Sequence, residues 1–224
     1  MKRLIIALAI LISTHIFAQN PLEKSIGEFT ELKVYDLIEV ELIKSEENKI
    51  VISGKNSEDV QFVNKNGKLK IRMALNEIFD GNKTSVKLHY TSVDIIDGNE
   101  GAYIFSNDVL KQFEIDLNAQ EGAKIKVKLD VTYVNIRSVT GSNINTSGKS
   151  KHQDISIYTG GVYKGKDLKT ESTEIAIRAG GEADVNATDV LDIKIRAGGD
   201  VYVYGDPKKI NKSKALGGRI KHMD

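Results

Sequence analysis

Arginine and tyrosine recur at one position of a repeated sequence unit, and they are the side chains best suited to binding chemistry in this chain. The position directly follows an apolar-polar-apolar triplet and holds Arg137, Tyr158, Arg178 and Arg196. A guanidinium group donates paired hydrogen bonds to carboxylates or sulfates, and an aromatic face packs against a sugar ring. Lined up on neighbouring strands, these residues would suit an acidic polysaccharide.

A second row of candidate residues follows the glycine corner of each unit. Tyr163 and Tyr202 occupy positions where we expect side chains to point outward, so both join the candidate ligand-binding residues. The alternative is that both rows simply cover a solvated sheet. Glu174 and Asp192 lie close enough in sequence to pair with the arginines, and exposed ion pairs stabilise little. Arginines without such partners would favour an anionic ligand.

These side chains need a repeating scaffold, and the chain contains one. Its clearest units are 155–161, 175–181 and 193–199. Each unit is a short alternating strand followed by two glycines, which tolerate the positive φ of a tight corner. Self-similarity at a period near twenty residues predicts stacked units that bury their inner faces against one another. We predict an all-β fold, a right-handed parallel β-helix or β-solenoid over 98–205, with Ile157, Ile177 and Ile195 stacked in adjacent coils.

The region before the repeat, residues 19–97, shows short alternating strands without the period. Asn66 and Gly67 stand between two such strands, which is a strong hairpin signal. We therefore predict a small antiparallel β domain here. No linker rich in proline or serine separates it from the solenoid, so the two parts should share a core.

The C-terminal residues 206–224 are expected to cap the last coil, whose strand edges would otherwise stay open. Pro207 should end the strand pairing because it lacks an N–H donor. Ile210, Leu216 and Ile220 are the apolar contacts available to such a cap. The two ends of a solenoid are also the places where copies of the chain could form an oligomer.

Residues 1–18 have the organisation of a signal peptide. Lys2 and Arg3 precede an apolar run over 4–12, and Ala18 offers a small residue for cleavage. The run is shorter than the ~20 residues of a membrane span. We expect an exported protein of the periplasm, the outer surface or the extracellular space, without stable membrane insertion after cleavage.

Composition argues against several functions. The formal net charge is +1, and it becomes −1 once the leader is removed, whereas nucleic-acid binding needs a strongly basic face. Cysteine is absent, which excludes disulfides and thiol chemistry. His89 and His152 are isolated, and the paired glycines precede no helix that could hold a phosphate. We expect no metal site, no cofactor and no nucleic-acid partner.

A β-helical polysaccharide-degrading enzyme is the main alternative to a binding module. A lyase would need clustered carboxylates for calcium and a basic proton acceptor, and a hydrolase would need two carboxylates across one cleft. The available acids are Asp184, Asp189, Asp192 and Asp200, beside Arg178 and Arg196. They fall largely at corners, where aspartate suits turns, and the coils lack long loops. We therefore predict no enzymatic activity and name no catalytic residue; a purely structural scaffold is the other alternative.

The C-terminal part of the repeat resembles a known family. Residues 199–207, which read Gly-Asp-Val-Tyr-Val-Tyr-Gly-Asp-Pro, and the segment 212–220 are similar to the C-terminal signature of the auto-transporter adhesin head domain family, common in Bacteroidetes. The pattern from Phe29 to Ile71 also resembles that family, so the likeness covers nearly all of the mature chain. Tyr90 to Ser92 depart from it, because a proline is expected there. The resemblance implies an exported β-helical protein with an adhesion role, and a cell-surface protein as a second class of partner.

Overall fold

The structure is a computed structural model that describes residues 21–223. Within these residues, sixteen strands form one sheet, and the single short helical element is the 3-10 turn η1 (Ser57–Asp59). Within the described part of the chain, no helix is long and apolar enough to cross a membrane. The predicted signal peptide, residues 1–18, lies outside the described residues.

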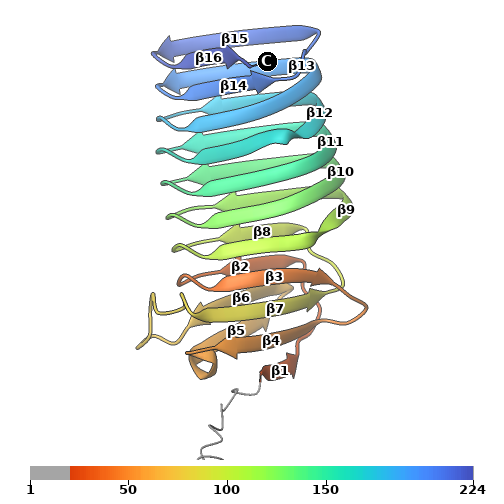
Figure 1. The fold of residues 1–224 in the computed structure, drawn as a ribbon, viewed down its shortest axis with the longest axis vertical. Coiled ribbons are helices and arrows are strands. Elements are labelled where there is room, and N and C mark those ends of the chain that lie inside the picture. Colours follow the sequence, from red (N-terminus) through yellow and green to blue (C-terminus); the bar gives the residue numbers. More distant parts are fainter. Residues whose placement is uncertain (1–20, 224) are drawn as a thin grey trace, which may run out of the picture.

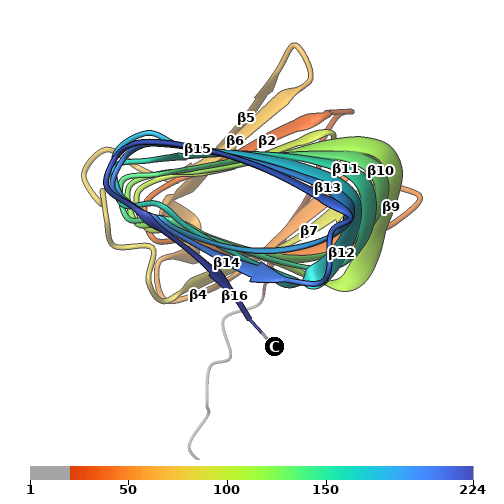
Figure 2. The same ribbon diagram turned by 90° about the horizontal axis from the view of Figure 1, so that it is seen from above.

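Long parallel strands form the regular part of the fold (Figure 1). They are β9 (Tyr103–Ala119), β10 (Lys124–Val139), β11 (Asn143–Tyr158), β12 (Val162–Ile177) and β13 (Glu182–Ala197). Each pairs in parallel with the next. Each also bends once, so that its two halves lie on opposite sides of a flattened coil (Figure 2). The predicted all-β solenoid is confirmed, with about seven turns.

The bend divides the sheet into two walls. Wall A contains the first halves of β9 to β13, and wall B contains their second halves. Wall A continues into β14 (Asp200–Tyr204) and β16 (Arg219–His222), and wall B continues into β15 (Lys209–Leu216). Between the walls lies a single apolar core that runs from Ile26 to Val203.

The predicted isoleucine ladder is confirmed within this core. Ile157 pairs with Ile177, and Ile177 pairs with Ile195. The first two are completely buried and the third is 2% exposed. Burying one such side chain contributes about 1.5–3 kcal/mol, so the ladder is a main source of stability.

Tight turns join wall B of one coil to wall A of the next. After β11, Thr159 and Gly160 have φ values of 48° and 73°, the pattern of a type I′ turn. In the following turn a Cβ atom at Gly181 would lie 2.5 Å from Cγ2 of Ile157 and 2.6 Å from the carbonyl oxygen of Gly161. Glycine at this position is therefore what lets successive turns stack closely.

The N-terminal strands lie out of sequence order along the stack. They are β1 (Leu22–Ser25), β2 (Glu31–Val34), β3 (Glu39–Lys44), β4 (Lys49–Gly54), β5 (Val60–Lys65), β6 (Lys68–Met73), β7 (Thr84–Tyr90) and β8 (Ile95–Gly98). β2 pairs in parallel with β6 and β8 in wall B, and β3 pairs in parallel with β7 and β9 in wall A. β2 and β3 thus form a coil inserted between β6–β7 and β8–β9.

This arrangement corrects the prediction that residues 19–97 are antiparallel. Strands that continue the two walls run in the direction of the coils, so their pairing is parallel. The antiparallel pairs within residues 21–97 are β1–β4, β4–β7 and β5–β6, at the end remote from the regular coils. The hairpin predicted at Asn66 and Gly67 is confirmed between β5 and β6, with φ values of 53° and 73°.

The C-terminal segment also differs from the prediction. Pairing resumes two residues after Pro207, because β15 adds in parallel to β13 and β16 adds to β14. Ile210 and Ile220 pack against the core, but Leu216 is 73% exposed. The segment is therefore one further coil rather than a cap. Its own outer edges pair with no other strand in residues 21–223.

Candidate functional site

The four residues predicted to bind a ligand lie on the outer surface of wall B, near the turns. Arg137 belongs to β10 and Tyr158 ends β11, while Arg178 directly follows β12 and Arg196 belongs to β13. Their neighbours Ile157, Ile177 and Ile195 point into the core, and alternation along a strand turns the next side chain outward. We call Arg137, Tyr158, Arg178 and Arg196 the arginine face.

The ring of Tyr158 lies between two guanidinium groups. The central carbon of Arg178 is 4.9 Å from the centre of the ring, and that of Arg137 is 5.5 Å from it. Both distances are typical of cation–π contacts. These contacts hold each guanidinium group against the ring and leave the N–H donors on the outer surface of the sheet.

Arg137 makes its contact diagonally, which corrects the expected register. In the sheet Arg137 pairs with Ser156, and Tyr158 pairs with Val139, two residues nearer the turn. The contact forms because an arginine side chain is long enough to reach a diagonal neighbour. Aligning the triplets sets Tyr158 21 residues after Arg137, but the coil from β10 to β11 advances by 19 residues, so the alignment misplaced Arg137 by two.

The acids that were expected to neutralise the arginines have other partners. Glu174 forms an ion pair with Lys194, with an N–O distance of 2.5 Å. Asp192 accepts a hydrogen bond of 2.5 Å from the side-chain amide of Asn211. Within residues 21–223, Arg137, Arg178 and Arg196 form no ion pair. The arginine face therefore presents three cations without a protein counter-charge in the described chain.

Tyr163 is not a surface residue, so its prediction as a ligand-binding residue is wrong. It is completely buried, and it pairs with Ile144 and Ala183, which also point inward. Its hydroxyl lies 2.6 Å from Oγ1 of Thr146, and the side-chain amide of Gln153 donates to it at 2.5 Å. Burial raises the pKa of the Tyr163 hydroxyl, so the group stays protonated.

The sequence did contain a signal for the position of Tyr163. The second residue after the glycine pair is Tyr163 in one coil and Ala183 in the next, and a small apolar residue at this position favours the core. The apolar side chain of Val162 favours the opposite assignment, with Val162 inside and Tyr163 outside. The structure leaves Val162 partly exposed and makes room for the aromatic ring above Gly165, where a Cβ atom would lie 2.3 Å from the Tyr163 hydroxyl.

Tyr202 points outward as predicted but lies on the opposite wall. It belongs to β14, which pairs with the first half of β13, whereas Arg196 lies near the end of β13. Lys221 lies over its ring, with the Nζ atom 5.6 Å from the ring centre. The arginine face and Tyr202 therefore do not form one site.

Wall B also carries a column of acids, in which Glu174 and Asp192 line up with Asp154, and this alignment was not predicted from the sequence. Asp154, Glu174 and Asp192 are aligned on β11, β12 and β13, four residues before the outward positions of the arginine face. Burial, together with the neighbouring Glu174, raises the pKa of Asp154. A stack of rings lies beyond this column towards the bend, where Tyr133 packs on Phe113 and on His152 at centroid distances of 5.3 and 4.7 Å.

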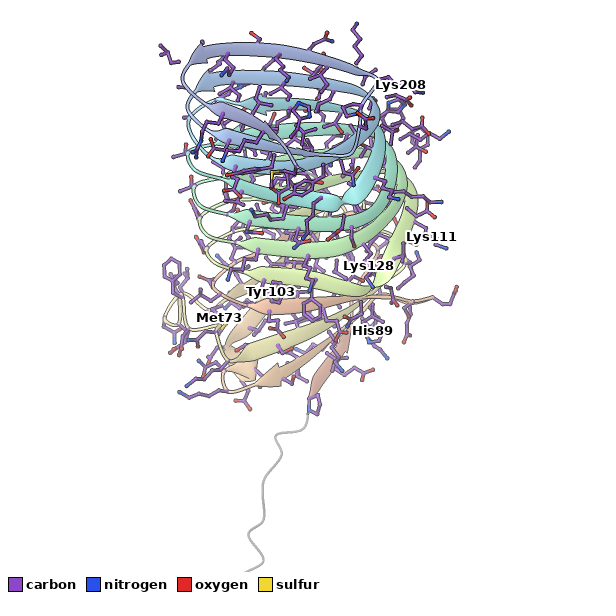
Figure 3. The ribbon with its side chains drawn as sticks, turned by 45° about the horizontal axis from the view of Figure 1, so that its top comes forward. Met73, His89, Tyr103, Lys111, Lys128 and Lys208 are labelled. Atoms are coloured by element: carbon purple, nitrogen blue, oxygen red, sulfur yellow. The ribbon has the colours of Figure 1, made fainter. Side chains whose placement is uncertain are left out.

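Lysines line the bend itself, and Figure 3 shows Lys111 and Lys208 projecting from that side. The column of acids separates these lysines from the arginine face, so an anion bound to the arginines would not continue to the bend. The aligned acids could have been found from the sequence, because each directly precedes one of the repeated apolar-polar-apolar triplets.

Three of the four acids considered for a lyase or hydrolase form separate ion pairs, and the fourth, Asp192, accepts the hydrogen bond from Asn211 described above. Asp184 lies 3.6 Å from the amine of Lys164, and Asp189 lies 2.5 Å from that of Lys208. Asp200 accepts a 2.8 Å hydrogen bond from Arg219. No group of three or more His, Cys, Asp or Glu side chains in residues 21–223 is arranged to hold a metal ion. The chemistry that the arginine face offers is recognition of anions.

Stacked parallel coils around one apolar core define a β-solenoid protein. The chain belongs to the family described as "Putative auto-transporter adhesin, head GIN domain", which matches residues 28–207. No curated protein matches the sequence.

Solved structures share the fold over nearly the full length of both chains. An adhesin described as putative from Bacteroides fragilis has a TM-score of 0.82 at 15% identity, covering 91% of this chain and 96% of that one. A protein described as a putative lipid binding protein from Parabacteroides distasonis has a TM-score of 0.71 at 17% identity, covering 92% and 98%. A putative adhesin from Parabacteroides merdae has a TM-score of 0.68 at 16% identity, covering 92% and 96%.

Proposed function

We propose that this chain is an exported, non-catalytic adhesion module that binds an acidic polysaccharide along the arginine face. The observation that carries the proposal is the set of three arginines without ion-pair partners among residues 21–223, two of them flanking the ring of Tyr158. Membership of an adhesin family supports the adhesion role. The arrangement of residues 1–18 supports export.

The ligand class follows from the geometry of the face. Neighbouring coils lie about 4.8 Å apart, so Arg178 and Arg196 are close neighbours, and Tyr158 separates Arg178 from Arg137. Like charges so arranged repel one another, and bound anions would relieve that repulsion. A polymer with regularly spaced carboxylates or sulfates can pair with several guanidinium groups at once, whereas a small anion would meet only one or two.

The test is binding of the purified mature chain to an array of uronate-containing, sulfated and neutral polysaccharides. Acidic polymers should bind, and binding should weaken as salt screens the exposed charges. Arg178→Ala with Arg196→Ala should reduce affinity by about tenfold per arginine, because a charge-assisted hydrogen bond contributes about 1.5–3 kcal/mol. Lys126→Ala with Lys128→Ala is the matched control, since it removes two exposed cations from wall A.

Other outcomes would select the alternatives. Release of unsaturated or reducing sugars from a bound polymer would indicate a polysaccharide-degrading enzyme. Absence of both binding and turnover would favour a structural scaffold. Binding that is independent of salt, or unchanged in the double arginine variant, would exclude the arginine face.

A further inference from the structure

A cavity of about 460 Å³ opens on wall B at the N-terminal end of the molecule. It lies against β5, β6 and the loop 74–83 that follows them. The β5–β6 hairpin projects beyond the outline of the stacked coils (Figure 2), and Met73, which ends β6, lies on this side of the molecule (Figure 3). The cavity therefore forms where the sheet leaves the regular stack.

One part of the cavity lining is apolar. Val63 from β5 and Leu75 and Ile78 from the loop are 55%, 71% and 47% exposed. Single exposed apolar side chains are common on protein surfaces, but a group of them around one cavity marks a binding region. An aliphatic chain lying on these side chains would remove apolar surface from water.

The neighbouring part of the lining is cationic. Lys70 and Arg72 alternate along β6, and Lys70 lies directly opposite Val63 on β5. Neither forms an ion pair among residues 21–223; Arg72 only donates a long hydrogen bond of 3.5 Å to the Gln61 side chain. Lys68 on the same strand is different, because it pairs with Glu31 at 2.9 Å. The two cations that line the cavity are thus those left without a counter-charge.

The loop is held in place by a buried carboxylate. Asp36 is 4% exposed and accepts hydrogen bonds from the backbone N–H groups of Met73 and Phe79, at 3.0 and 3.3 Å. Asp36, Leu37, Phe79 and Glu100 all have φ between 51° and 64°, which is costly for residues other than glycine. Such conformations persist only where the surrounding structure enforces them, so the cavity is a formed feature.

We propose that this cavity binds an amphipathic anion, with a carboxylate or phosphate head at Lys70 and Arg72 and an aliphatic chain on Val63, Leu75 and Ile78. Glu100 and Asp36 are the acids in the lining that oppose such a ligand, and both carboxylate oxygens of Asp36 are directed at backbone N–H groups. The head group can belong to a free amphiphile or to a lipid in a bilayer. This site is separate from the arginine face, and its ligand differs in kind.

The test uses calorimetric titration of the mature chain with dodecanoate and with dodecyl phosphate. Butanoate, which lacks the chain, and dodecanol, which lacks the anion, are the matched ligands. Flotation with phosphatidylglycerol vesicles, compared with phosphatidylcholine vesicles, tests the bilayer as the source of the head group. We expect saturable binding of at least one dodecyl anion or of the anionic vesicles, and weaker or no binding of the matched ligands.

Variants separate the two parts of the cavity. Lys70→Ala with Arg72→Ala should weaken binding by about tenfold or more, and Leu75→Ser with Ile78→Ser should do the same, while Glu100→Gln should strengthen it. All three sites are on the surface, and thermal melts check that each variant folds. Absence of binding by dodecanoate, dodecyl phosphate and anionic vesicles would overturn the proposal, as would unchanged binding in both double variants. Polysaccharide binding measured on the same variants should not change, because the cavity is separate from the arginine face. A negative result for the cavity can therefore be distinguished from a negative result for polysaccharide binding at the arginine face.

Discussion

The arginine face and the N-terminal cavity lie on the same wall of the molecule but arise in opposite ways. On β10 to β13 the coils repeat, so outward side chains form columns and the surface stays flat. At β5 and β6 the stack is interrupted by the inserted β2–β3 coil, and the hairpin turns away from it. Repetition thus produces an extended row suited to a polymer. Its interruption produces a concave site suited to a single small molecule.

The same contrast applies to stability. The regular coils depend on identical inward positions that stack without gaps, so a change at one such position is felt by both neighbouring coils. Around the cavity, Val63, Leu75 and Ile78 are exposed, so few other groups contact them. Substitutions should therefore have large effects in the coils and small effects around the cavity.

The largest effect is expected for Ile177→Asp. Ile177 is completely buried between Ile157 and Ile195, so an aspartate there would place an unpaired charge in the core. We expect a loss of more than about 4 kcal/mol in the free energy of unfolding, or no folded protein. Ile78→Asp is the control, because Ile78 is 47% exposed and should cost less than about 1 kcal/mol. Urea denaturation followed by circular dichroism gives both values, and similar values would contradict the comparison.

A smaller effect is expected for Gly181→Ala. Gly181 has a φ of 115°, and an added Cβ atom would contact Ile157 and the Gly161 carbonyl. We expect a loss of about 2–3 kcal/mol, from backbone strain combined with the clash. Gly122→Ala isolates the strain, because Gly122 has a φ of 75° but nothing within 4 Å of an added Cβ. Denaturation midpoints should separate the two variants. Equal losses would show that close stacking of the turns is not the cause.

The buried hydroxyl of Tyr163 should contribute less. Tyr163→Phe leaves Thr146 and Gln153 without that partner inside the core, which costs about 1–3 kcal/mol. Tyr133→Phe is the matched control, because Tyr133 is 39% exposed and its hydroxyl has no hydrogen bond within residues 21–223. The free energies of unfolding should differ between the variants. An equal effect at both positions would mean that the buried network is not a stabilising feature.

The smallest effect concerns Glu100 at the cavity. Burial, with the neighbouring Asp36, raises the pKa of Glu100, so the folded chain binds a proton there more readily than the unfolded chain does. Its contribution to stability is therefore present at low pH and is lost as the pH rises through the raised pKa. Glu100→Gln should remove that loss and stabilise the chain slightly at neutral pH. Unfolding measured from pH 4 to 8 tests this, and a steeper fall with pH in the variant would contradict it.

Several features of the fold follow from local sequence alone. Alternation of apolar and polar residues and the recurring glycine pairs predicted the stacked coils, and the Ile157–Ile177–Ile195 ladder is as expected. Asn66 and Gly67 likewise predicted the β5–β6 hairpin. These features are predictable because each depends on conformational preferences within a few residues. In the solenoid, the same preference also recurs in several copies of the repeat.

Other features depend on which distant segments of the chain lie next to each other, and only the tertiary structure determined these. The inserted β2–β3 coil, the diagonal contact of Arg137 with Tyr158 and the pairing of Glu174 with Lys194 all join residues far apart in the sequence. Tyr163 falls between the predictable and the unpredictable features. Its position in the repeat places it inside, whereas its residue type suggested the surface. Coil lengths of 18, 19 and 20 residues shift the register between strands. A shift of one residue moves a side chain to the opposite face of the sheet, and a shift of two residues changes its neighbours on the same face. The alternation of apolar and polar residues therefore predicts which way a side chain points, but it does not predict which side chains it contacts.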